Sequence, residues 1–395
     1  MFDVSLRFAK DTGSATARIA ERAGLIAALF VFIFCLPPFK AQAQGPRVGP
    51  GNVFVHTKFG GFILGYDIDQ SGTEGILSES LTLGGGKYDV AVETFDQKTG
   101  KILSVVAQQK NSHNDYVTLG IEGQGVGLVE YERAKGIFVG QRQYAMLNPL
   151  SGNKFTGRWT PPLTKDDIII GLSASQGSSN AAVMAFDNGG NFNSFLFSTN
   201  VGANTFGSIV NVTDSVFDFN NSPVMAMDTA TNQAVLGSSF GCYGCSTEIG
   251  LVDLTQGTVT TFPGLGFGFV NGIAVDSNTG IACTTTEDDF SVEFYDLANQ
   301  TGFIVPIPGA TNQAQSGADV EVDPINKLFF VGQPFTSTGF TGSSIQVFDE
   351  QGNFVESING LKLPVSPVRI ALNPTHRMGY VLVTPDLTSL QSFTY

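Results

Sequence analysis

From residue 45 to the end of the chain, apolar and polar residues alternate in short stretches. Residues 271–275, Asn-Gly-Ile-Ala-Val, lead into a polar turn, and a second short apolar stretch follows at 281–283. Helix-forming residues are scarce, and no amphipathic segment of about ten residues separates the stretches. Short alternating runs bounded by turn residues are typical of β-strands, whereas an α/β fold needs amphipathic helices between its strands. The pattern therefore predicts an all-β protein.

Four similar units recur along the second half of the chain. Each consists of a short apolar strand, a turn that opens with Asp or Asn, and a second strand; the units cover residues 224–237, 271–283, 318–331 and 368–382. The residues that open the turns are Asp228, Asp276, Asp323 and Asn373. Their spacing of about 48 residues lies within the range of β-propeller blades. Asp and Asn are expected there because their side chains accept hydrogen bonds from the backbone of their own turn.

Each unit also contains a third strand and a further hairpin, so that it has the four strands of one blade. Hairpins of this kind occur at 250–259, 292–303 and 344–358. The repeating strand–turn–strand pattern also appears earlier, at 90–103, at 127–140, which closely resembles 320–332, and in a less regular unit at 168–199. Counting the turns gives about seven units, and irregular spacing between residues 130 and 225 leaves six or eight open. The sequence therefore predicts a single β-propeller of about seven four-stranded blades.

The last predicted unit is one strand short, and the chain has additional strands before the first complete unit. About three strands of the last unit precede Tyr395, and strands between Val53 and about Leu83 precede the first clear inner strand. We expect the amino-terminal strands to complete the final blade, so that both ends of the propeller pair in one sheet. Such pairing closes the ring and leaves no exposed sheet edge.

The units at 271–283 and 318–331 come nearest to a pattern of x-Ile-Ala-Val-Asp, a short turn and then Ile-x-Val, with substitutions at several positions. In this they resemble the repeats of secreted β-propellers of the YVTN and NHL types. The resemblance covers roughly the last 170 residues well and the first half loosely. The tetrapeptide signature of the family is replaced by other residues, namely 282–284, 330–332 and 380–382. The resemblance implies a fold and not an activity, because propellers host hydrolases, lyases and binding scaffolds alike.

The first 43 residues have the features of an export signal. Lys10, Arg18 and Arg22 precede an apolar run at 24–36, and the small-residue pattern Ala-Gln-Ala ends at Ala43. A positive region, a short apolar core and a small-residue site are typical of a cleaved secretory signal. A bilayer span needs about 20 apolar residues, more than this run supplies, although an uncleaved anchor is the alternative. The sequence predicts a signal peptide at 1–43, a propeller at 44–395, and a secreted or periplasmic protein.

Composition and charge narrow the choice of partners. Charged residues make up 14% of the chain, with 47 Gly and 33 Phe, and the net charge is −14. Nucleic-acid binding needs a basic patch that displaces counterions from phosphates, and an anionic membrane surface also attracts basic segments. The balance therefore argues against both partners, and we expect no membrane contact after signal cleavage. It favours a soluble monomer that meets an extracellular ligand or protein.

Export leaves three cysteines in the mature chain: Cys242, Cys245 and Cys283. The first two have CxxC spacing, but no predicted helix follows them and no histidine or second cysteine pair accompanies them, which argues against redox and zinc sites. In an oxidising compartment we expect a small Cys242–Cys245 disulfide that stiffens a loop. Cys283 stands in an alternating run and is expected to be a buried small apolar residue.

Polar residues at the predicted ends of inner strands are candidate metal ligands. Propeller hydrolases of the gluconolactonase type hold a metal with Glu, Asn and Asp at the mouth of the central channel. The corresponding positions here offer Asp89, Asn271 and Asp319, and Arg369 is a further residue at such a position. A set of carboxylate and amide oxygens would suit Ca²⁺. Polar residues that line a wet channel without a metal are the alternative interpretation.

A second, weaker calcium candidate lies near the start of the propeller. Asp67, Asp69 and Ser71 place oxygens at positions 1, 3 and 5 of a loop, with Gly72 at position 6, as in a calcium-binding loop. Position 12 is Ser78, and the nearest carboxylate, Glu79, comes one residue late. A plain β-turn is therefore the competing interpretation.

The chain contains no recognisable catalytic motif. It has no G-x-S-x-G sequence, no phosphate-binding glycine loop and only three scattered histidines. We therefore expect an exported, non-enzymatic β-propeller that needs no cofactor and binds a ligand or protein through loops on one face. The alternative is a metal-dependent propeller hydrolase of the lactonase type with bound Ca²⁺, which requires Asp89, Asn271 and Asp319 to converge.

Overall fold

The computed structural model describes residues 48–395 except for short gaps, and only the backbone is described between residues 111 and 160. The gaps are 70–71, 86, 113–116, 122–125, 134–140, 149–153, 160–161, 164–166, 175–179, 188–192, 201–204, 213–223, 238–245, 287–289, 311–316, 334–343, 362, 364–368 and 384–386. The predicted signal peptide therefore lies outside the described residues.

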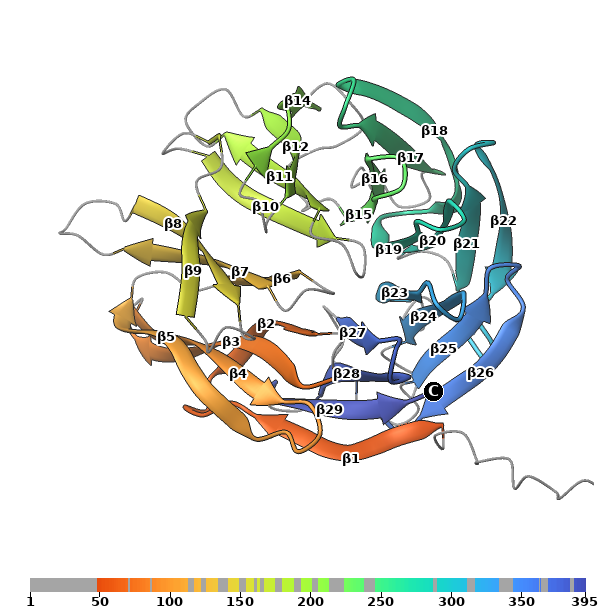
Figure 1. The fold of residues 1–395 in the computed structure, drawn as a ribbon. Coiled ribbons are helices and arrows are strands. Elements are labelled where there is room, and N and C mark those ends of the chain that lie inside the picture. Colours follow the sequence, from red (N-terminus) through yellow and green to blue (C-terminus); the bar gives the residue numbers. More distant parts are fainter. Residues whose placement is uncertain are drawn as a thin grey trace, which may run out of the picture. The chain divides into compact units, whose positions relative to one another are not determined.

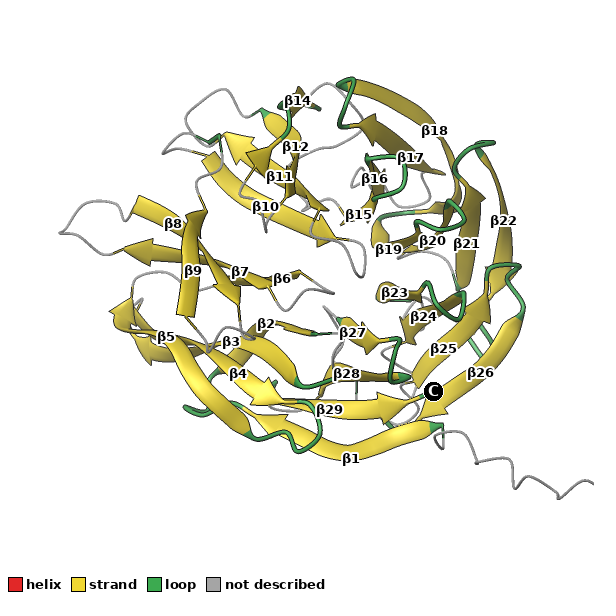
Figure 2. Cartoon of the chain, viewed as in Figure 1, coloured by secondary structure: helices red, strands yellow, loops and turns green. Residues whose placement is uncertain are grey.

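Every regular element of the described chain is a β-strand, as Figure 2 shows. The strands form seven sheets, which we number as blades 1 to 7 in the order of their innermost strands. Blade 1 consists of β2 (Phe62–Ile68), β3 (Glu74–Gly84), β4 (Lys87–Asp96) and β5 (Ile102–Ser112). Blade 2 consists of β6 (Val117–Ile121), β7 (Val126–Arg133), β8 (Gln141–Asn148) and β9 (Lys154–Trp159). Blade 3 consists of β10 (Asp167–Ala174), β11 (Asn180–Asp187), β12 (Ser194–Asn200), β13 (Thr205–Phe206) and β14 (Val210–Asn211).

The remaining blades come from the second half of the chain. Blade 4 consists of β15 (Val224–Asp228), β16 (Gln233–Gly237), β17 (Ser246–Asp253) and β18 (Thr258–Phe267). Blade 5 consists of β19 (Val270–Asp276), β20 (Ile281–Thr286), β21 (Ser291–Asp296) and β22 (Thr301–Pro306). Blade 6 consists of β23 (Asp319–Asp323), β24 (Leu328–Gln333), β25 (Ser344–Asp349) and β26 (Phe354–Asn359). Blade 7 consists of β27 (Ile370–Asn373), β28 (Met378–Val383), β29 (Ser389–Thr394) and β1 (Gly49–His56).

The innermost strands of the blades form a closed ring (Figure 1). Strands β2, β6, β10, β15, β19, β23 and β27 each contact the next, and β27 contacts β2. The predicted all-β propeller is confirmed, with six four-stranded sheets in the described chain. The seventh, blade 3, differs because two short strands, β13 and β14, share the outer edge of β12. No helix long and apolar enough to cross a membrane occurs among the described residues.

Strands from both ends of the propeller lie in blade 7. β1 pairs antiparallel with β29, with Val55 opposite Leu390 and Phe54 opposite Gln391. Val55 and Leu390 are both fully buried. Near the other end of β1, a Cβ atom on Gly51 would lie 2.1 Å from the Ser392 Oγ, so only glycine permits this close approach.

The turn-opening aspartates cap their turns as the sequence analysis predicts. Asp228 accepts hydrogen bonds from the Ala230 backbone N–H at 3.0 Å and from the Thr231 hydroxyl at 2.6 Å. Asp276 accepts the Asn278 backbone N–H at 2.8 Å in the same way. Each cap satisfies backbone donors that no strand partner reaches, which holds the hairpin in one geometry.

The core lies between neighbouring blades, where side chains of facing sheets pack together. Between blades 5 and 6, Phe294 packs edge-on against Phe329, with ring centroids 5.5 Å apart, and lies 6.3 Å from Phe348. All three rings are fully buried. This packing keeps the blades in fixed positions, so residues at their ends form lasting sites.

Candidate functional site

The three sequence-predicted metal ligands lie in two separate parts of the ring. Asn271 and Asp319 lie in neighbouring innermost strands, β19 and β23. The Asn271 amide donates a hydrogen bond to the Gly317 carbonyl oxygen at 3.2 Å. Asp89 lies instead on β4, the third strand of blade 1, opposite Leu81. The expectation that Asp89 stands at the end of an innermost strand is therefore wrong.

No group of three or more His, Cys, Asp or Glu side chains in the described chain is arranged to hold a metal ion. Asn271 and Asp319 lie on the innermost strands of the adjacent blades 5 and 6, whereas Asp89 lies on the third strand of blade 1. Adjacent strands therefore do not assemble the predicted carboxylate–amide–carboxylate set. A calcium role for Asp89, Asn271 and Asp319 thus stays a prediction without support from their placement.

In the Asp67–Gly72 turn, Asp69 is an anchor for the backbone. Its carboxylate accepts the Gln97 amide at 2.8 Å and the Thr73 hydroxyl at 3.2 Å, and its carbonyl oxygen accepts the Asn373 amide at 2.8 Å. These contacts join blade 1 to blade 7 and satisfy a buried carboxylate. Ser71 lies outside the described residues, so the weaker calcium loop stays a prediction.

A cluster of carboxylates lies on the innermost strands around Arg369, which directly precedes β27. Asp67 of β2 accepts the Ile68 backbone N–H at 2.7 Å, and Glu321 of β23 accepts the Val322 backbone N–H at 2.9 Å. The inner edge of an innermost strand has no strand partner, so its N–H groups need other acceptors. These carboxylates supply them.

Asp319 connects blade 6 to blade 7, because its Oδ2 accepts the Ile370 backbone N–H at 2.9 Å. Burial raises the pKa of the Asp319 carboxyl to about 7, against the lowering effect of the Arg369 charge. Burial also raises the pKa of Glu321 and of Asp67, and carboxylate neighbours reinforce both shifts. These carboxyls therefore hold protons at higher pH than ordinary aspartates and glutamates do.

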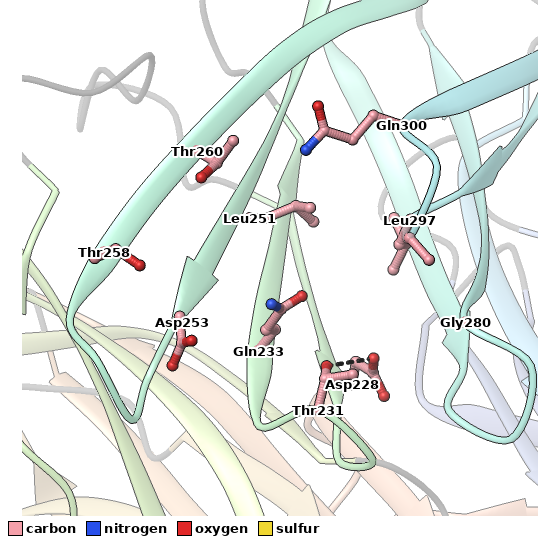
Figure 3. A pocket seen from close by; sticks show the side chains of 11 residues that line it. Asp228, Thr231, Gln233, Leu251, Asp253, Thr258, Thr260, Gly280, Leu297 and Gln300 are labelled. Atoms are coloured by element: carbon pink, nitrogen blue, oxygen red, sulfur yellow. Dashed lines mark hydrogen bonds between the residues drawn. The ribbon is translucent and has the colours of Figure 1, made fainter.

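A pocket of about 310 Å³ lies between blades 4 and 5. Blade 4 contributes residues from three strands that share one face, because strand register places Gln233 opposite Asp253, Asp253 opposite Thr258, and Leu251 opposite Thr260. Figure 3 shows Thr258 and Thr260 on one side, Leu297 and Gln300 of blade 5 on the other, and Gln233 and Leu251 between them.

The pocket lining combines hydrogen-bonding groups with a small apolar surface. Two amides, three threonine hydroxyls and two carboxylates line it, beside leucine and alanine side chains; the lining residues are Asp228, Thr231, Gln233, Leu251, Asp253, Thr258, Thr260, Gly280, Leu297, Ala298 and Gln300. No Lys, Arg, His or Cys is among them. This set can bind a polar molecule through hydrogen bonds and apolar contacts.

The sequence analysis missed this pocket, because it saw these residues only as parts of separate hairpins. The signal was a run of Thr and Gln on one face of β16, β17 and β18, at alternate positions such as Thr258 and Thr260. The alternation of side chains along these strands shows which residues share one face of blade 4, but not which blade packs against that face. The hairpin of blade 5 that completes the site lies beside blade 4 only through the packing of the two blades.

Cys283 is a free thiol and is fully buried, as the sequence analysis predicts. Burial, together with the nearby Glu293 carboxylate, raises the pKa of the thiol well above its ordinary value, which leaves it unreactive. Cys242 and Cys245 lie outside the described residues, so their disulfide stays a prediction.

Comparison with known proteins assigns the chain to no group. Its sequence matches no protein-family model, and no curated protein matches it. The function must therefore be argued from the sites themselves, since a β-propeller carries many unrelated activities.

Proposed function

We propose that this chain is an exported, non-enzymatic β-propeller that binds an extracellular ligand in the pocket between blades 4 and 5. The observation that carries the proposal is the pocket lining, in which Gln233, Thr258, Thr260 and Gln300 have side chains without a hydrogen-bond partner among the described residues. Polar groups on a rigid surface that are not used within the fold are available to a ligand.

The leader at residues 1–43, with cleavage after Ala43, supports export, and we propose that the mature protein acts outside the cytoplasm as a monomer. The repeats at 271–283 and 318–331 support a relationship to secreted propellers of the YVTN and NHL types. In such a protein the blades are the scaffold, and the hairpins at the blade ends supply the binding groups.

The test uses the mature chain from Gln44 in saturation-transfer NMR against three sets of probes: neutral saccharides, short peptides and small amines. Binding of at least one set, with no new product signals over a day, is the expected result. Failure of all three sets, or conversion of a bound probe into product, would overturn the proposal.

The carboxylates around Arg369 favour a second candidate function, a metal-dependent propeller hydrolase of the lactonase type. Carboxyls with raised pKa values are suited to proton transfer and are common in active sites. Asp319 and Glu321 are the residues of this cluster on β23, and Asp67 adds a third carboxylate from β2.

A thermal melt separates the two candidates. We expect EDTA and then added Ca²⁺ to shift the melting temperature of the mature chain by less than about 1 °C, because the carboxylates already accept backbone N–H groups and face Arg369. A fall of several degrees in EDTA that Ca²⁺ reverses would instead favour the hydrolase, with lactones as the next substrates to assay.

A further inference from the structure

We infer that the pocket between blades 4 and 5 takes one or two rings of a neutral saccharide. The inference rests on the proposed binding function and names the ligand class of that same pocket. Its volume of about 310 Å³ is at the lower end of the range for small-molecule sites.

The first argument is the pairing of donors and acceptors. A sugar hydroxyl donates one hydrogen bond and accepts others, so it needs both kinds of group around it. The amides of Gln233 and Gln300 and the hydroxyls of Thr258 and Thr260 each offer both. Asp253 uses its Oδ1 to cap the Thr255 and Gln256 backbone N–H groups at 2.8 and 2.9 Å, while its Oδ2 has no partner among the described residues. That oxygen adds an acceptor of high strength.

The second argument is the apolar part of the lining. Leu251 and Leu297 are buried side chains that contribute to the pocket surface. A pyranose ring has an apolar face of C–H groups and a rim of hydroxyls. Leu251 and Leu297 can contact the C–H face, and the polar residues of β18 and of the blade 5 hairpin can hydrogen-bond to the hydroxyl rim.

The third argument is charge. Phosphates, uronic acids and other anions need a cationic partner, and no Lys, Arg or His lines the pocket. The chain as a whole carries a net charge of −14, which repels anions further. The lining therefore selects an uncharged polyhydroxylated ligand over an anionic one.

The fourth argument is the backbone at Gln300. This residue has φ of 53° at a turn position where blades 1 and 4 have Gly100 and Gly257, with φ of 70° and 73°. Left-handed backbone is unfavourable for a residue with a side chain, and glycine would remove the strain.

The other four non-glycine residues with left-handed backbone in the described chain use their side chains within the fold, and one of them, Leu387, packs against the core between blades 1 and 7. Asn232 donates to the Thr255 hydroxyl, Lys327 pairs with Glu350 at 3.5 Å, and Arg377 lies over the Tyr395 ring. The Gln300 side chain instead lines the pocket (Figure 3). The left-handed backbone of Gln300 belongs to the turn that Asp296 caps, and no hydrogen bond within the described chain uses the Gln300 amide, which leaves it able to contact a ligand in the pocket.

The experiment compares the mature wild-type chain with three variants. Gln300→Gly removes the amide and the strain together, and Thr260→Val removes one hydroxyl while keeping the shape of the side chain. Gln351→Ala changes an exposed glutamine in the equivalent hairpin of blade 6 and is the matched control. Saturation-transfer NMR and titration calorimetry use glucose, galactose, mannose, N-acetylglucosamine, maltose and cellobiose, with glucuronate as the anionic probe and short peptides and small amines as the non-sugar probes.

We expect at least one neutral sugar to bind wild type and Gln351→Ala equally, and glucuronate to bind neither. Gln300→Gly should weaken that binding at least about tenfold while its melting temperature stays the same or rises. Thr260→Val should weaken binding about three- to tenfold, since it loses one hydrogen bond.

Two outcomes would overturn the inference, and they are distinguishable from each other. If only peptide or amine probes bind, and Gln300→Gly abolishes that binding, the pocket is a binding site but not for sugars, and the proposed function survives. If a sugar binds all four proteins equally, or no probe binds any of them, the pocket has no role in recognition and the proposed function fails with it.

Discussion

Replacing Phe294 by alanine is expected to lower the free energy of unfolding by about 3–5 kcal/mol. The ring is fully buried between blades 5 and 6, stacked on Phe303 at 5.3 Å and edge-on to Phe329 at 5.5 Å. The variant loses the burial of the ring and leaves a cavity that the rigid sheets cannot close. For a propeller of this length the corresponding fall in melting temperature is about 4–7 °C.

Urea denaturation followed by fluorescence or circular dichroism measures the effect. Phe62→Ala is the matched control, because that ring is 50% exposed and its truncation should cost less than about 0.5 kcal/mol. A loss below about 1 kcal/mol for Phe294→Ala would contradict the tight packing of blades 5 and 6.

The second large effect is a loss of stability as the pH rises. Seven carboxyls in the described chain have raised pKa values, and burial is the main cause for each. The largest shifts bring the pKa to about 7 for Asp319, Asp67 and Glu93, about 8 for Glu321 and about 6 for Asp276. Between the ordinary carboxyl pKa near 4 and these values, the folded chain holds more protons than the unfolded chain. The contribution of these protonated carboxyls to the free energy of unfolding is therefore complete below about pH 4, and it is lost as the pH rises through about 6–8.

Neighbouring carboxylates increase the pKa shift at Glu93 and Asp276, as they do at Glu321 and Asp67. Glu93 lies beside Glu79, and Asp276 lies beside Glu350. The negative charge of each neighbour opposes the ionisation of Glu93 and of Asp276. Asp319 and Glu321 are partly exposed, and solvent screens some of their repulsion. We expect a net loss of about 3–6 kcal/mol between pH 5 and pH 8.

Thermal melts at pH 5, 6, 7 and 8 and constant ionic strength check this, with an expected fall in melting temperature of about 4–8 °C. Glu321→Gln removes one titrating group and should make the decline shallower. Asp296→Asn is the control, because the Asn299 side chain holds the pKa of that exposed carboxyl below its ordinary value and it stays ionised over the whole range. A melting temperature that is constant or rises from pH 5 to pH 8 would refute the prediction.

The sequence analysis predicts the wrong position within the blade for some strands. Residues 90–103 show an apolar strand, a turn opened by Asp96 and a second strand, and the sequence analysis takes them for the start of a unit. The structure places them in β4 and β5, the third and fourth strands of blade 1. Asp96 caps its turn just as Asp276 caps an innermost hairpin, with N–H···O distances of 2.8–2.9 Å. Local turn chemistry is the same for both kinds of hairpin, so it cannot tell them apart.

This ambiguity explains why Asp89 was grouped with Asn271 and Asp319. All three precede short apolar strands, but only the last two strands face the channel. The sequence analysis names three residues of the carboxylate cluster around Arg369 but divides them between two sites. It assigns Asp67 to the calcium loop, and Asp319 and Arg369 to the mouth of the channel. What joins them is the contact of β27 with β2 and β23, which links residues about 300 positions apart in the chain.

The sequence by itself determined the fold class, the spacing of the repeats and the turns that end the strands. These follow from local preferences: side chains alternate along a strand, and Asp or Asn bonds to the backbone of its own turn. Only the tertiary structure decided which strands line the channel, which carboxyls are crowded enough to hold protons near neutral pH, and which hairpins share a pocket. Those properties depend on the distance between blades and on the exclusion of water between them, and neither is encoded in any one unit.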